Sequence, residues 1–88
     1  MTKVTTIYTG DVFDMQEVAD LSGVDFTAWF ARGSWKGEPE GSRVWQLIDD
    51  SPIRHRLFVG ALTTLARKAG ESAILVTTFE VESELVQV

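Results

Sequence analysis

Hydrophobic and polar positions predict a strand near each end of the chain. Residues 3–9 are mostly β-branched or aromatic and end at Gly10, which is typical of a strand closed by a turn. Residues 73–85 predict a second, longer strand. Its first part, residues 73–76, is apolar at every position, so we expect it to lie centrally and to be covered on both faces. Beyond it, apolar residues alternate with glutamates, which predicts one buried face and one exposed face.

A short helix is predicted over residues 14–22. Asp14 and Glu17 stand at the N-cap and N3 positions of a capping box, and Gly23 fits a left-handed C-cap that ends the helix. A second short helix over residues 25–31 would complete a helical hairpin. The first helix is expected to turn four side chains toward the core: Met15, Val18, Ala19 and Leu21.

The main core helix is predicted to start at Ser51-Pro52, with serine as N-cap and proline at N1, and to run to Gly70. Before it, residues 32–42 hold three glycines and a proline, which predicts a loop without regular structure. Residues 43–49 suit either a strand or a short helix, and we favour the helix. The buried side of the long helix is expected to contain Phe58, Ala61, Leu62, Leu65 and Ala69.

These elements predict a single α+β domain over residues 1–88. A small sheet formed by the N- and C-terminal strands packs against the long helix, beside a short N-terminal helical hairpin, and residues 32–42 form a glycine-rich loop. The chain has 88 residues, 44% hydrophobic and 24% charged, which suits one globular unit. No uncharged apolar run approaches the length of a membrane span and the start has no signal pattern, so we expect a cytoplasmic protein without membrane contact.

The residue inventory argues against an enzyme. The chain has no cysteine and one histidine, so neither thiolate chemistry nor an imidazole cluster for a metal is expected. That histidine, His55, lies between Arg54 and Arg56 with no nucleophile placed beside it by the sequence. The glycines match no nucleotide-binding motif. We therefore predict no catalytic residue, no cofactor and no metal site.

Charge is segregated along the chain, and it indicates a protein partner. The formal net charge is −5, and residues 51–70 contain basic but no acidic residues between two acidic segments. An acidic surface disfavours nucleic acid and favours basic partners. Trp35 beside Lys36 in the glycine-rich loop suits a contact residue, and a row of glutamates on the last strand would repeat every ~6.6 Å. The candidate partner-binding residues are Trp35, Lys36, Glu38, Glu40, Asp49, Asp50, Glu80, Glu82 and Glu84.

The leading hypothesis is thus a small acidic, non-enzymatic protein-binding module. A concrete version is an inhibitor or decoy, as phages encode against host defence, that acts on a basic nucleic-acid-handling protein. The glutamate row also suits an ordinary solvated strand face. A homodimer is a further hypothesis, with Trp35 or Trp45 in its interface.

Residues 17–27, Glu-Val-Ala-Asp-Leu-Ser-Gly-Val-Asp-Phe-Thr, carry an alternative. They contain the Val-Ala pair of a first helix, a Gly-Val turn and a capping side chain, and this segment resembles the helix-turn-helix of lactose-repressor-type regulators and phage excisionases. The resemblance implies a DNA-binding regulator that uses residues 14–32. The segment departs from that pattern in its acidic side chains and in an aromatic second helix, where Arg32 is the single cation.

Overall fold

The structure is a computed structural model that describes residues 2–35 and 37–88, apart from the side chain of Trp35. In the described residues, two helices and four strands follow one another as a βαββαβ series, which confirms the predicted α+β class. In order they are β1 (Thr2–Gly10), α1 (Met15–Ser22), β2 (Thr27–Trp35), β3 (Glu38–Asp49), α2 (Pro52–Lys68) and β4 (Leu75–Val81).

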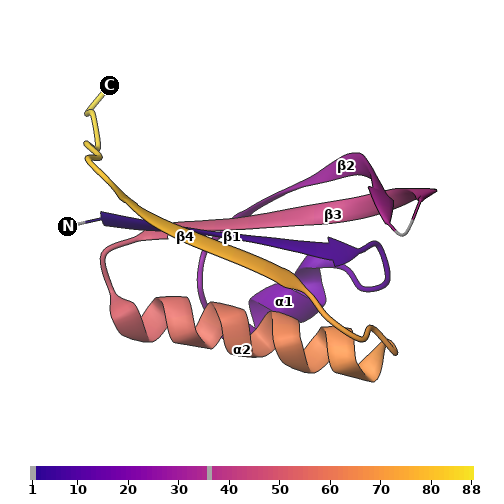
Figure 1. Cartoon of the computed structure of the whole chain (residues 1–88). Coiled ribbons are helices and arrows are strands. Elements are labelled where there is room, and N and C mark those ends of the chain that lie inside the picture. The colour runs from indigo at the N-terminus through magenta and orange to yellow at the C-terminus, as the bar shows by residue number, and fades with distance from the viewer. Residues whose placement is uncertain (1, 36) are drawn as a thin grey trace.

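The four strands form one antiparallel sheet in the order β2-β3-β1-β4. This order is the split βαβ, or ferredoxin-like, arrangement. The N- and C-terminal strands are neighbours, as the sequence predicted. Both helices lie on the same side of the sheet, and the other side carries no further layer in the described chain (Figure 1).

The core lies between the sheet and the helices. Ile7 of β1 and Leu47 of β3 face Phe58 and Leu62 of α2, and all four are buried. Trp45 of β3 is fully buried at the centre of an aromatic group. Its ring stacks on Phe13 at 5.5 Å between centroids and meets Phe26 at 5.7 Å. Its Nε1 donates a hydrogen bond to Thr9 Oγ1 at 2.9 Å. A tryptophan whose one polar atom is satisfied can be buried at little cost.

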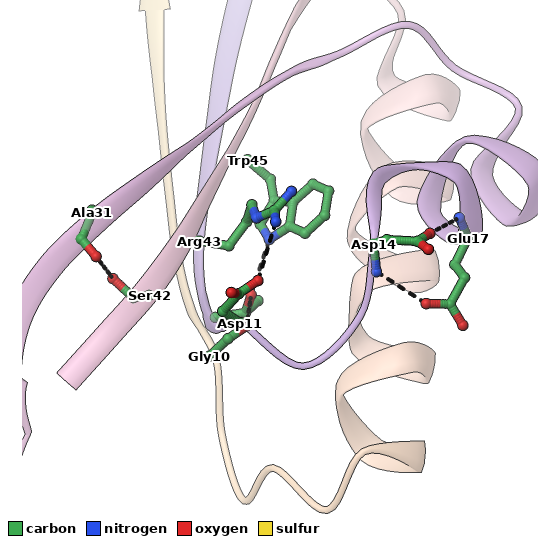
Figure 2. Close-up of polar contacts among 9 residues, drawn as sticks. Gly10, Asp11, Asp14, Glu17, Ala31, Ser42, Arg43 and Trp45 are labelled. Atoms are coloured by element: carbon green, nitrogen blue, oxygen red, sulfur yellow. Dashed lines mark hydrogen bonds and ion pairs between the residues drawn. The ribbon is translucent and has the colours of Figure 1, made fainter.

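The two predicted helices with strong end signals are confirmed. At α1 the Asp14 carboxylate accepts from the backbone N–H of Glu17, and the Glu17 carboxylate accepts from that of Asp14 (Figure 2). Gly23 closes α1 at φ 68°. At α2 the Ser51 hydroxyl accepts from the backbone N–H of Arg54. Three burial predictions on these helices are wrong, because these side chains are exposed: Met15, Leu21 and Ala69.

The middle of the chain is a long β-hairpin, which corrects three predictions. The predicted helix over residues 25–31 is instead the start of β2, and the predicted loop over residues 32–42 continues β2, turns at Gly37 and enters β3. Residues 43–49, for which a helix was favoured, belong to β3. Each β2 residue from Thr27 to Trp35 pairs with β3, so the backbone hydrogen bonds of the ladder outweigh the weak local preference of its glycines.

The last strand is shorter and more exposed than predicted. β4 covers Leu75–Val81 in place of residues 73–85, and it lies at the edge of the sheet rather than centrally. Leu75 and Phe79, expected to be buried, are more than half exposed, and Leu85 lies beyond the strand. The reason is the helix layer: α2 packs on β1 and β3, so it does not cover the β4 edge.

Candidate protein-binding face

The uncovered side of the sheet, called the open face below, is built from alternate residues of all four strands. Ile7 and Trp45 point to the helices, so their neighbours along each strand point the other way. The strand register arranges those neighbours in rows across the sheet. Two rows are apolar, Trp29-Val44-Tyr8-Leu75 and Ile48-Val4-Phe79, and the row between them is polar without charge, Thr27-Gln46-Thr6-Thr77.

Five large side chains of the open face remain exposed to solvent, while Val4, Thr6 and Val44 between them are buried. Large side chains of about 200 Å² each, half exposed, present roughly 500 Å² of apolar surface. Patches of this size on a monomer are often functional, and a typical interface takes about 800 Å² from each partner. The exposed fractions are 42% for Tyr8, 41% for Trp29, 55% for Ile48, 60% for Leu75 and 53% for Phe79.

Charge is excluded from the middle of the open face and is negative at its hairpin end. None of the described residues in the three rows is charged. At the hairpin end, Glu38 and Glu40 take open-face positions on β3. Glu82 and Glu84 lie beyond the end of β4, on either side in the chain of Ser83, whose hydroxyl is hydrogen-bonded to that of Thr2 at 2.7 Å between oxygens. The described cations occupy helix-facing strand positions or α2: Lys3, Arg32, Arg43, Arg54, Arg56, Arg67 and Lys68.

A hollow of about 420 Å³ adjoins the open face where β1 ends. Tyr8 and Leu75 line its apolar side, and Glu40 and Glu71 supply two carboxylates. The Glu71 carboxylate accepts a hydrogen bond from the backbone N–H of Gly10 at 2.8 Å. A Cβ at Gly10 would collide with that carboxylate, so the Glu71 side chain would have to move if Gly10 were replaced. The hollow therefore combines an aromatic ring with negative charge, which suits a cationic side chain.

The structure separates the carboxylates that the sequence grouped as one site. Glu38 and Glu40 lie at the hairpin end of β3, and Asp49 and Asp50 lie at its other end. The predicted glutamate row does not form: Glu80 takes a helix-facing position opposite Lys3, and Glu82 and Glu84 lie beyond the end of β4. The predicted contacts of the Trp35 side chain and of Lys36 fall outside the described residues.

Asp49 has a local structural task at the start of α2. Its Oδ1 accepts from the backbone N–H of Ser51 at 2.7 Å, and its carboxylate pairs with Arg54 at 3.2 Å. The Ser51 hydrogen bond lowers the pKa of Asp49 below its ordinary value, and Arg54 adds to this effect. The carboxylate thus fixes the turn from β3 into α2, which leaves it less able to contact a partner.

His55 and Arg43 are also held by internal contacts. His55 Nε2 donates to the carbonyl of Asp49 at 2.8 Å, so Nδ1 can accept from the Thr5 hydroxyl at 2.6 Å. Arg43 pairs with Asp11 at 3.1 Å (Figure 2). Its guanidinium also lies over the ring of Phe30. Among the described residues, no group of three or more metal-binding side chains comes together.

The sequence matches no protein-family model and no curated protein. Among solved structures the chain is similar to one described as "De novo designed protein Foldit4", with a TM-score of 0.53 and 15% identity, covering 93% of this chain and 100% of that chain. This likeness shows the fold alone. Neither of the described helices is long and apolar enough to cross a bilayer.

The residues that dominate the open face were missed by the sequence analysis. Tyr8 and Ile48 lie in segments where both faces are apolar or β-branched, so no alternation marks the uncovered side. Phe79 does alternate with glutamates, but its side of the strand was predicted to be buried, whereas it lies on the open face. Trp29 was predicted to lie on a helix, where the side chains beside it would differ from those beside it in β2.

Proposed function

We propose that the protein is a non-enzymatic binding module whose open face docks a basic partner protein. The observation that carries the proposal is the uncharged apolar surface of Tyr8, Trp29, Ile48, Leu75 and Phe79 on a sheet with helices on its other side alone. Aromatic side chains surrounded by buried small residues are the usual energetic centres of interfaces. The docking partner presents an apolar strip to the two apolar rows.

Charge complementarity defines the partner further. Glu38 and Glu40 flank the open face at its hairpin end, while the described cations take helix-facing positions or lie on α2. A partner with cations at the end of its apolar strip that meets the hairpin would meet opposite charge on docking, and an acidic partner would meet like charge. The hollow beside Tyr8 fits one lysine or arginine of the partner between Glu40 and Glu71.

An inhibitor or decoy that acts on a nucleic-acid-handling protein is one form of this function. Such enzymes and regulators carry the basic surfaces that the acidic rim would attract. The proposal differs from the sequence hypothesis in its contact surface: the apolar rows supply most of the binding free energy, and the carboxylates supply orientation and speed of association.

The DNA-binding alternative loses its structural basis. A helix-turn-helix reads the major groove with its second helix, and residues 25–31, predicted as that helix, form none: residues 27–31 belong to strand β2. The homodimer hypothesis loses Trp45 as an interface residue because Trp45 is fully buried.

The proposal is tested by affinity capture from source cells, followed by binding measurements with the purified captured protein. We expect a basic protein whose association rate falls steeply with added salt, and falls several-fold further in Glu40→Gln. Asp20→Asn, which removes a carboxylate from the solvent side of α1, is the matched control and should change the rate little. A captured partner with an acidic surface, or equal rates for Glu40→Gln and the wild-type chain, would refute the charge assignment.

A further inference from the structure

The outer strand β4 is open to solvent on both faces and along its edge. It forms the end of the sheet beyond β1, and six of its seven residues are exposed. Val76 takes a helix-facing position, yet it remains 37% exposed because α2 packs on β1 and β3. The free edge presents the backbone N–H and C=O groups that another strand can pair with.

Most features that normally block such pairing are missing from β4. Its segment Leu75-Val-Thr-Thr-Phe79 has no charge and no proline, and its pairing with β1 runs without a bulge from Leu75 to Val81. The one charged residue of β4, Glu80, follows this segment. Residues of this kind favour extended structure. The other edge strand, β2, contains Arg32 and Gly33, and glycine weakens a strand. The β4 edge is therefore the better site for another strand.

The uncharged segment of β4 is chemically symmetric about Thr77. When β4 pairs antiparallel with an identical strand around that residue, Leu75 lies opposite Phe79 and Val76 lies opposite Thr78 of the other copy. Thr77 lies opposite its own equivalent. Apolar, β-branched and threonine pairs of these kinds stabilise antiparallel strands. Glu80 falls outside the segment, opposite Ile74, so like charges do not face each other.

We propose that two copies of the chain associate through antiparallel β4–β4 pairing centred on Thr77. The two-fold axis runs perpendicular to the sheet, so an eight-stranded sheet forms with all four helices on one side and two adjoining open faces on the other. One strand pair buries less than the about 800 Å² per partner of a standard interface. The dimer is therefore expected to dissociate on dilution. This inference does not depend on the proposed basic partner.

Thr77 and Thr27 provide a matched pair of test positions. Both threonines are exposed in the same polar row of the open face, at opposite edges of the sheet. In sedimentation velocity we expect the wild-type chain and Thr27→Lys to shift from monomer to dimer with rising concentration. Thr77→Lys should remain monomeric, because two lysines would face each other across the axis.

Cross-linking supplies a second readout in a chain that has no native cysteine. Under mild oxidation Thr77→Cys should form a disulfide-linked dimer at least about tenfold faster than Thr27→Cys, because pairing holds the two Thr77 positions together. A wild-type chain that stays monomeric, or equal cross-linking at the two positions, would overturn the proposal. Association through the open faces is distinguished because Thr27→Lys would then disrupt the dimer as well. Circular dichroism measures whether each variant is folded. If Thr77→Lys is unfolded, the comparison of Thr77→Cys with Thr27→Cys tests the dimer.

Discussion

A chain carrying Trp29→Thr together with Phe79→Thr is expected to bind the captured partner at least about 100-fold more weakly than the wild-type chain. The two side chains stand in different apolar rows, on opposite edges of the open face. Truncation of an aromatic residue in an interface often lowers the binding free energy by ~2 kcal/mol or more. Two such truncations should therefore weaken binding more than the loss of one carboxylate at the rim. The dissociation constant, measured by titration calorimetry, tests this expectation.

Ile53→Thr is the control for the open-face variant. Ile53 is 65% exposed on α2, so its replacement removes a similar apolar group from the helix side. Its binding should match the wild-type chain. Urea unfolding must show that the double variant is folded, because Trp29 lies beside the buried Val44. Wild-type affinity in a folded double variant would remove the open face from the interface.

Trp45→Ala is expected to have the largest effect on stability, about 3–5 kcal/mol in the free energy of unfolding. Trp45 is fully buried, stacks on Phe13, and donates to Thr9, whose hydroxyl in turn donates to the carbonyl of Gly10. A domain of this size has a total stability of roughly 5–10 kcal/mol. The variant should therefore unfold at a much lower urea concentration.

Trp45→Phe separates packing from hydrogen bonding at the same position. It keeps an aromatic ring next to Phe13 and loses the N–H donor, so a cost nearer ~1–2 kcal/mol is expected. Thr9 keeps its bond to Gly10 in that variant. A cost below about 1.5 kcal/mol for Trp45→Ala would contradict the central place of this ring in the core.

The sequence predicts those elements whose ends carry side-chain signals. Asp14 with Glu17, and Ser51 with Pro52, satisfy free backbone N–H groups or remove one, so local chemistry alone identifies both helix starts. The signal that predicts β1 is local as well, because it consists of the β-branched residues of the strand itself. These features were found because the deciding atoms lie within four residues of each other.

The long hairpin depends on contacts that a local pattern does not contain. Gly33 pairs with Glu40 and Gly41 pairs with Arg32, so both glycines lie within the strand ladder. The composition of residues 32–42 is nevertheless typical of a loop. Residues 27–31, Thr-Ala-Trp-Phe-Ala, are apolar after the threonine and show no strand alternation, since β2 is an edge strand that carries large apolar side chains on both faces. Pairing with β3 decides its conformation.

The sequence predicted carboxylates as contact residues, which stays a prediction, and it did not indicate the open face. The packing of α1 and α2 decides which face of the sheet stays uncovered. The sequence of β1 does not show which face this is, because Val4 on the open face and Thr5 on the helix-facing side are both buried. The strand register is what places the open-face residues next to one another, and a local sequence pattern does not contain it.

Two isoleucines allow the most direct test of the open face. Ile48 lies on the open face and Ile53 lies on α2, and both are more than half exposed. With isotope-labelled isoleucine methyl groups, NMR titration with the captured partner should shift or broaden the Ile48 signal and leave Ile53 unchanged. A perturbed Ile53 beside an unchanged Ile48 would contradict the account, because the partner would then occupy the helix side.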